Sequence, residues 1–339
     1  MAKSAGKLVS ALILFGTTAV LGIGSVVLRD DHALWDPLLR VHDALLLASG
    51  RDTIGEIYVT PERLLRKREQ FPEHAAESAA EAVSRYEKTC NAPVYLLAVP
   101  TSAGMYADAI PAAAPMASES EFLTELRENL SDDVSWIGTE SWLAAEREHE
   151  IYCRTSPLWT SYGAFCVYRA AVRRLGFTAH GYDSLAITHY TANYFGELAQ
   201  EIRYYDVQPD LIDMFELMQP DPTLRVSEIL GDGSTVSCGK SCYAPEEAQK
   251  SGDAEDVYLL HRHPILRTQS LSGSKRLLLL TDDYGAVMLP LLTSHYQTVT
   301  AVNLPRAKGA DWKRLTDSGC DHVLILLGVD TLAEGISLN

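Results

Sequence analysis

The sequence is short of positive charge. Its 339 residues include 29 Lys and Arg against 45 Asp and Glu, which gives a formal net charge of -16 at neutral pH. A surface of this sign repels the phosphate backbone of nucleic acids unless a local basic patch overrides the average. The densest basic stretch, residues 63–68, has the spacing of the solvated face of a helix. The sequence therefore argues against nucleic acid as a partner.

Cysteine is sparse and poorly placed for a metal site. Among the six cysteines, only Cys238 and Cys242 lie close together in the sequence. A structural zinc site needs two close pairs of Cys or His ligands, so we expect no metal, and we expect no cofactor. If the protein is exported, Cys238 and Cys242 are the favoured local disulfide, although the sequence leaves the pairing open.

Repeats and low-complexity tracts are absent, and there is one long apolar run. Residues 8–28 are 21 positions without a charge, enough at about 1.5 Å per residue to cross a hydrocarbon layer about 30 Å thick. Lys3 and Lys7 precede the run, and Asp30 and Asp31 follow it. The positive-inside bias then keeps the N-terminus in the cytoplasm and exports the rest.

A cleaved signal peptide is the alternative, because Gly22 and Gly24 form a small-x-small pair before Ser25. The run is long for the apolar region of such a peptide, so we prefer an uncleaved anchor. We predict a cytoplasmic tip and transmembrane anchor over 1–28, a linker over 29–54 and an exported domain over 55–339. This places a single-pass protein in the cytoplasmic membrane with its main domain extracytoplasmic.

Apolar runs of strand length alternate with helical segments along the exported part. Such alternation predicts an α/β fold, in which a mainly parallel sheet with right-handed crossovers is flanked by helices in three layers. Residues 178–253 lack a steady period and should insert hairpins and loops. The expected strands are 57–59, 94–99, 134–137, 257–260, 276–280, 299–302 and 323–327. The expected helices are 60–88, one opened by a capping box at Ser118 and Glu121, 141–148, 159–175 and 285–295.

Ligands of an open parallel sheet gather beyond the carboxyl ends of its strands. The loops 100–102, 154–160 and 281–284 qualify. His261 and His263 are expected on an extended segment that would put both imidazoles on one side. We interpret them as surface residues, with a replacement catalytic base as the alternative.

Two blocks of sequence resemble the DHHW family. Residues 152–164 are similar to its signature, which reads aromatic-aromatic-basic-Thr-Asp-His-His-Trp-Thr and then a Gly-Ala helix start. The Asp-His-His core is missing here. Residues 277–292 are similar to the family's apolar strand, its Gly-Asp-Ser-aromatic turn and a helix that carries Pro. With weaker matches at 94–101, 207–210 and 321–325, the resemblance spans 55–332. The matching positions of the two main blocks are Thr155, Trp159, Thr160, Gly163, Ala164, Asp282, Tyr284, Pro290 and Leu291.

The resemblance implies a fold similar to SGNH hydrolases and to the periplasmic proteins of alginate O-acetylation. In that group a Ser at a strand-to-helix turn is the nucleophile, and an Asp-x-His pair supplies the base and its orienting carboxylate. Carried over, the nucleophile position is Asp283, the carboxylate position is Ser156 and the base position is Leu158. All three are substituted, and Leu158 has no lone pair. The resemblance therefore implies an inactive acyl-transfer site.

Six further residues in these loops are candidate binding residues. Simpler roles compete with binding: Trp159 suits packing at a helix start, and the hydroxyls of the first loop suit helix capping. Of the neighbours Asp282 and Asp283, one suits a helix cap and the other a solvated position. The candidate binding residues are Thr101, Ser102, Arg154, Trp159, Asp282 and Tyr284.

Three functions are compatible with these observations. The first is a non-catalytic or impaired relative of cell-surface O-acyltransfer proteins, which acts as an accessory or binding module. The resemblance implies a multipass membrane O-acyltransferase and an envelope glycan as its partners. The second is a divergent O-acetyltransferase or esterase with a relocated base. The third is a structural envelope protein, for which the space at residues 281–284 should be filled by side chains.

Overall fold

The computed structural model describes residues 47, 49–111, 114–316 and 319–338. An eight-stranded sheet forms its centre, in the order β5-β4-β13-β11-β12-β10-β8-β9. The strands from β5 to β12 pair in parallel, as predicted, while β10, β8 and β9 extend one edge by antiparallel pairing. The bounds are β5 Val134–Ile137, β4 Val94–Val99, β13 His322–Gly328, β11 Arg276–Thr281, β12 Thr298–Asn303, β10 Ile265–Gln269, β8 Arg225–Ile229 and β9 Thr235–Gly239.

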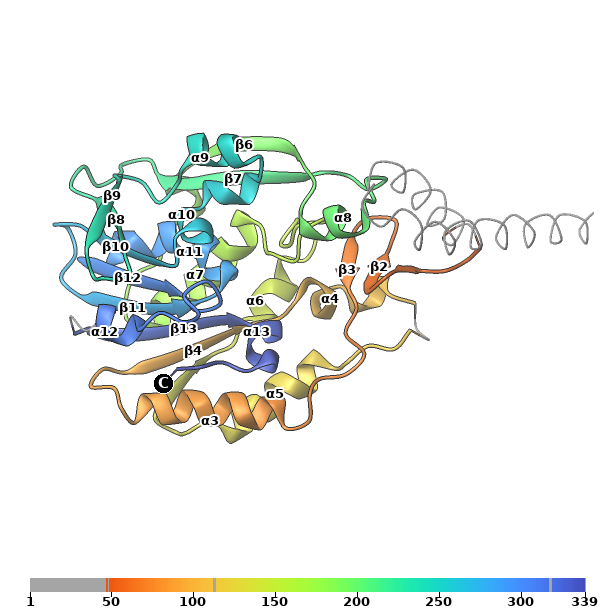
Figure 1. Cartoon of the computed structure of the whole chain (residues 1–339), viewed down its shortest axis with the longest axis horizontal. Helices are drawn as coiled ribbons and strands as arrows, with labels where there is room; N and C mark the ends of the chain where they lie inside the picture. Colours follow the sequence, from red (N-terminus) through yellow and green to blue (C-terminus); the bar gives the residue numbers. More distant parts are fainter. Residues whose placement is uncertain (1–46, 48, 112–113, 317–318, 339) are drawn as a thin grey trace, which may run out of the picture.

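Helices cover both faces of this sheet and produce the predicted three layers (Figure 1). Side chains of a strand alternate between faces, so Leu279 joins one core and its neighbours Leu278 and Leu280 join the other. The first core is closed by α7 and α11, and the second by α3, α5, α12 and α13. The bounds are α7 Ser161–Arg174, α11 Asp283–Leu292, α3 Ala75–Glu87, α5 Glu119–Asn129, α12 Trp312–Thr316 and α13 Val329–Glu334.

Two small sheets lie outside the central one. One consists of β1, β2 and β3, with α8 packed against β3, and β1 falls inside the segment predicted as a linker. The other is the β6–β7 hairpin, which confirms that residues 178–253 insert hairpins. The bounds of these and of the short helices are β1 Thr53–Ile54, β2 Ile57–Val59, β3 Leu64–Arg66, β6 Leu185–Tyr194, β7 Asp210–Leu217, α4 Ser102–Met105, η1 Ala107–Ala109, α6 Glu140–Ala145, η2 Tyr182–Ser184, α8 Glu197–Ile202, α9 Pro245–Ser251, η3 Ala254–Val257, α10 Leu259–Arg262 and η4 Thr293–His295.

The predicted helix start at Thr60 is wrong. The Thr60 hydroxyl donates to the Arg63 carbonyl and accepts from its N–H, at 2.7 and 3.1 Å, so the chain turns from β2 into β3. The solvated helix face predicted for 63–68 is also wrong. Arg63 is 4% exposed, and its guanidinium lies 3.5 Å from the centre of the Tyr106 ring. The Ala-rich helix begins only at Ala75.

The predicted strand at 257–260 is wrong as well. The segment forms the end of η3 and the start of α10. A short run of buried apolar residues is compatible with either a strand or a helix. Here the Asp253 carboxylate accepts from the Glu255 N–H and caps the helical turn.

The predicted anchor at residues 8–28 lies outside the described residues. Among the residues that are described, no helix is long and apolar enough to cross a membrane.

Candidate functional site

The two sequence blocks meet at the carboxyl edge of the sheet. The Trp159 indole N–H donates to the Tyr284 carbonyl at 3.0 Å, and the Tyr284 hydroxyl donates to the Pro157 carbonyl at 3.1 Å. The two rings pack edge to face with centres 5.3 Å apart. Residues 125 positions apart in sequence are therefore joined at one place.

Close packing explains the small residues at the end of the first block. The Thr160 hydroxyl accepts from the Gly163 N–H at 3.1 Å and caps α7. A Cβ atom at Gly163 would lie 2.1 Å from the Ile151 carbonyl oxygen. Only glycine lets the first turn of α7 approach the preceding segment this closely, which fixes how the loop of residues 152–160, here called the motif loop, enters the helix.

Replacing Trp159 with phenylalanine should test this junction. The indole is 1% exposed, so the replacement removes its buried hydrogen bond to the Tyr284 carbonyl and leaves a smaller ring in the same space. We expect the free energy of unfolding to fall by about 1–3 kcal/mol in urea denaturation. Trp142→Phe, at a tryptophan that is 37% exposed, should change it by less than about 0.5 kcal/mol. Equal effects of the two variants would contradict the assigned role.

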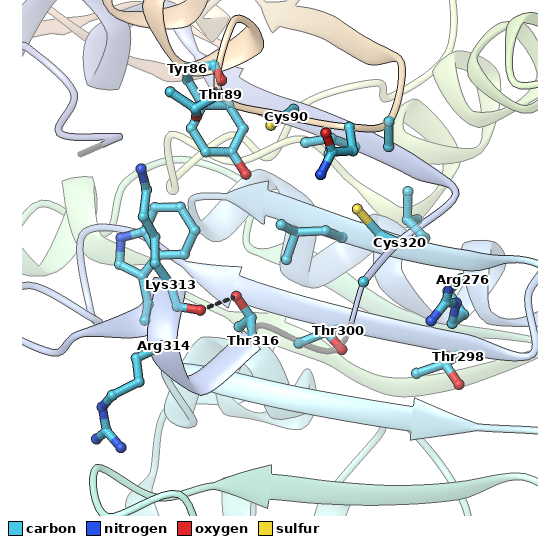
Figure 2. A pocket seen from close by; sticks show the side chains of 17 residues that line it. Tyr86, Thr89, Cys90, Arg276, Thr298, Thr300, Lys313, Arg314, Thr316 and Cys320 are labelled. Atoms are coloured by element: carbon cyan, nitrogen blue, oxygen red, sulfur yellow. Dashed lines mark hydrogen bonds between the residues drawn. The ribbon is translucent and has the colours of Figure 1, made fainter.

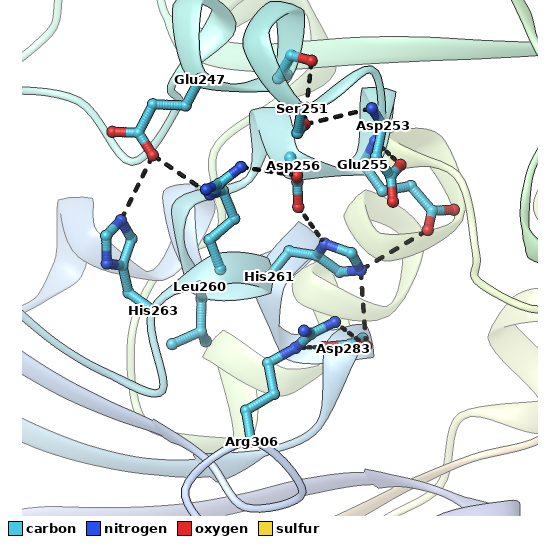
Figure 3. A network of polar contacts seen from close by, with 12 residues as sticks. Glu247, Ser251, Asp253, Glu255, Asp256, Leu260, His261, His263, Asp283 and Arg306 are labelled. Carbon is cyan, nitrogen blue, oxygen red and sulfur yellow. Dashed lines mark hydrogen bonds and ion pairs between the residues drawn. The ribbon is translucent and has the colours of Figure 1, made fainter.

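Asp283, at the nucleophile position, is held in an ion pair. Its Oδ1 accepts from Asn303 Nδ2 at 2.6 Å and from Arg306 Nε at 2.9 Å, and its Oδ2 accepts from Arg306 Nη2 at 2.9 Å. Figure 3 shows the Arg306 guanidinium against this carboxylate. Both carboxylate oxygens are therefore engaged by side chains from the end of β12 and the loop after it.

Ser156, at the orienting position, has a new partner. It is fully buried, and its hydroxyl donates to Glu255 Oε1 at 2.5 Å. Burial raises the pKa of Glu255 to about 8, with Asp253, Asp283 and Asp210 adding to the effect. A carboxyl group therefore lies beside the position where the family has one, although it comes from η3.

Leu158, at the base position, is 8% exposed and packs in the larger apolar core. The imidazole nearest Asp283 belongs instead to His261. Its Nε2 lies 3.7 Å from Asp283 Oδ2, and its Nδ1 lies 2.9 Å from Asp256 Oδ1 (Figure 3). His261 thus stands between Asp256 on one side and Asp283 and Glu255 on the other, since its Nε2 also lies 3.8 Å from Glu255 Oε2.

The extended segment predicted for the two histidines is wrong, because His261 is in α10. His263 does not face the same way: its Nδ1 lies 3.0 Å from Glu228 and its Nε2 lies 3.6 Å from Glu247. Of these two histidines, only His261 is near the nucleophile position.

Among the residues that the structure describes, one group of side chains has the composition of a metal site. Asp253, Asp256 and His261 each bring a ligand atom within 4.8 Å of the others. Asp253 Oδ1 already accepts hydrogen bonds from the Tyr194 hydroxyl and the Glu255 N–H, at 2.8 and 3.0 Å. The His261 ring is hydrogen-bonded to the Asp256 carboxylate. Internal hydrogen bonds account for the arrangement, and we assign no ion to it.

Asp210 fixes the motif loop. It is 3% exposed, and its carboxylate accepts from the Arg154 N–H at 2.5 Å, from the Thr155 N–H at 2.9 Å and from the Thr155 hydroxyl. The same hydroxyl accepts from the Gly196 N–H at 2.8 Å. Asp210 therefore anchors the loop to β7.

Most of the candidate binding residues cap helices or pack in the interior. The Thr101 hydroxyl caps α4, and Ser102 is 2% exposed in its first turn. The packing role of Trp159 is confirmed by its burial. Asp282 caps α11 and also accepts from the Gly328 N–H at 2.8 Å, and burial raises its pKa to about 6.

Arg154 and Tyr284 differ in what they face. Arg154 pairs with Glu150 at 2.6 Å and lines a cavity beside α7. Tyr284 is 7% exposed and bonded to the motif loop. Of the residues described here, Arg154 is the candidate best placed to meet a ligand.

The six cysteines are free in the structure, so Cys238 and Cys242 are not joined in it. Cys90 and Cys320 line a cavity of about 450 Å³ at the amino ends of the strands (Figure 2). Burial raises the pKa of both thiols. Asp283 lies at the opposite, carboxyl end of β11, so this cavity is separate from the candidate site.

Three important residues were missed in the sequence. Asn303 ends β12 and Arg306 follows it, and the rule that ligands gather beyond strand ends could have pointed to them. Glu255 lies just after the stretch without period, and no spacing relates it to Ser156, 99 residues earlier. No sequence signal would have found that contact.

No protein-family model and no curated protein sequence matches the chain. Solved structures do. A DHHW family protein from Eubacterium siraeum is 15% identical, with 84% of this chain and 98% of that chain covered and a TM-score of 0.65. Bacillus cereus PatB1 is 15% identical over 81% and 96%, with a TM-score of 0.68. The O-acetyltransferase domain of Pseudomonas putida AlgJ is 13% identical over 83% and 94%, with a TM-score of 0.49.

At this level of identity the likeness concerns the fold. It extends over nearly the full length of the two structures with the higher TM-scores. The described part of the chain therefore has the fold of the DHHW family protein and of PatB1, in agreement with the resemblance of its motifs to that family.

Proposed function

We propose that the chain is a membrane-anchored, extracytoplasmic module that assists O-acylation of a cell-surface glycan without catalysing it. A multipass membrane O-acyltransferase and an envelope glycan are its proposed partners. The motif resemblance supports the link to O-acylation. The apolar run at residues 8–28 and its flanking charges support the anchor and the location.

The observation that carries the absence of catalysis is the state of Asp283. A carboxylate is a weak nucleophile when both oxygens accept from a guanidinium and one also accepts from an amide, because attack must break those bonds. An acyl group transferred to it would form an anhydride, which water cleaves readily. Leu158 offers no proton acceptor to assist.

A divergent esterase or O-acetyltransferase is the second candidate. The Asp256–His261 pair supports it, since a carboxylate on Nδ1 is what orients a catalytic imidazole. The Nε2 atom, however, faces the carboxylates of Asp283 and Glu255, at 3.7 and 3.8 Å, and not a hydroxyl. A structural envelope protein is less well supported, because the Asp283 side chain remains 33% exposed.

Hydrolysis of p-nitrophenyl acetate by the purified chain should test the proposal. We expect the rate to equal that of the uncatalysed reaction and to be the same in Asp283→Ala and His261→Gln, because no activated hydroxyl lies at the site. The measurement is the absorbance of released p-nitrophenolate against a buffer blank.

Two outcomes would overturn it. Turnover that is lost in Asp283→Ala would make Asp283 a nucleophile. Turnover that survives in Asp283→Ala and is lost in His261→Gln would favour the enzyme with a relocated base.

A further inference from the structure

A cavity of about 780 Å³ lies between α7 and the β6–β7 hairpin. Its volume falls within the roughly 300–1,000 Å³ of small-molecule sites. Arg154 and Thr160 of the motif loop contribute to its wall, whereas Asp283 does not. The cavity therefore adjoins the candidate site but is distinct from it.

One wall is aromatic. Tyr182 is 48% exposed, and its ring packs edge to face against Tyr162, Phe165 and Phe215 at 5.8, 5.4 and 5.9 Å. All four residues line the cavity. A large exposed ring held by three others presents a rigid apolar face at little entropic cost on binding.

Charged side chains also line the cavity. The Arg169 guanidinium lies 6.0 Å from the centre of the Phe165 ring and makes no hydrogen bond or ion pair with the described residues. The Asp213 side chain is 18% exposed, with His189 on its Oδ1 at 2.6 Å. Arg154 and Glu150, which also line the cavity, form an ion pair.

A ligand for these walls must have an apolar face and a rim of groups that both donate and accept hydrogen bonds. The ring C–H groups and hydroxyls of a sugar have this pattern. The charged lining includes three acids, Glu150, Asp210 and Asp213, and two guanidinium groups, Arg154 and Arg169, an excess of one acid (3 − 2 = 1). Such a lining disfavours a polyanion.

We propose that this cavity binds a neutral oligosaccharide, with Tyr182 as the stacking surface and Arg169 as a hydrogen-bond donor to its hydroxyls. The inference rests on the proposed function in the choice of a glycan over other polyhydroxylated ligands. It assigns the binding role of the module to a site separate from the substituted acyl-transfer positions.

Binding to the purified full chain in detergent should be measured by calorimetry with cellotetraose, chitotetraose and tetragalacturonic acid. We expect at least one neutral tetrasaccharide to bind about tenfold more tightly than the acidic one. Tyr182→Ala should weaken that binding about tenfold and Arg169→Met about fivefold. Tyr205→Ala, at a tyrosine that is 43% exposed and does not line the cavity, should change it less than twofold.

The inference is overturned if no neutral probe binds, if tetragalacturonic acid binds best, or if Tyr182→Ala and Tyr205→Ala behave alike in chains whose circular dichroism is unchanged. Ester hydrolysis tests the proposed function independently. An inert protein that binds no neutral sugar would reject the inference alone, and an active esterase that binds one would reject the non-catalytic role alone.

Discussion

The Asp210→Ala variant should lose about 3–5 kcal/mol of unfolding free energy, because it leaves buried donors without a charged acceptor. The wild-type carboxylate serves two backbone N–H groups and a hydroxyl of the motif loop, all within one buried segment. Without it, the Thr155 hydroxyl also loses its alignment toward Gly196. Guanidinium chloride denaturation followed by tryptophan fluorescence gives the difference.

Two further variants serve as controls for this expectation. Asp210→Asn keeps one carbonyl oxygen and should lose roughly half as much stability. Asp132→Ala removes an exposed aspartate and should change stability by less than about 0.5 kcal/mol. A loss below about 1 kcal/mol in Asp210→Ala would show that the loop is held by other contacts.

The Glu255→Gln variant should show a stability difference from the wild type that grows with pH. Burial raises the pKa of Glu255 to about 8 from a value of 4.5 in the unfolded chain. Between these values the folded state keeps a proton that the unfolded state has lost, so wild-type stability falls as pH rises. Glutamine stays neutral and avoids this loss.

The expected gain of Glu255→Gln relative to the wild type increases by about 1.4 kcal/mol per pH unit between pH 5 and 8 and then levels off. Urea midpoints at four pH values provide the measurement. Glu246→Gln, at an exposed glutamate of α9, should show no such trend. A difference that is independent of pH would mean that the His261 imidazole keeps Glu255 ionised.

The parallel core of the sheet was predictable because its strands are buried on both faces. Residues 94–99, 277–280 and 323–327 are continuous apolar runs, and each lies within an observed strand. The antiparallel edge was not predictable in the same way. Residues 265–269 read Ile-Leu-Arg-Thr-Gln, a short and half-polar segment that resembles a loop.

The site was predictable only where the sequence matches a known motif. The motif blocks identified the positions of Asp283, Ser156 and Leu158, and the structure brings both blocks to one edge of the sheet. The partners of those residues depend on tertiary contact. Arg306 and Glu255 reach the site from separate segments, and neither position is set by distance along the sequence.

The hydrogen bond between Ser156 and Glu255 also sets a condition for any redesign of this position. An aspartate introduced at Ser156 would meet the carboxyl of Glu255, whose Oε1 lies 2.5 Å from the present hydroxyl oxygen. The two carboxyl groups could share the proton that Glu255 holds below about pH 8, whereas above that pH both would be charged in a buried space. A carboxylate engineered at position 156 to stay ionised therefore calls for a second substitution in η3.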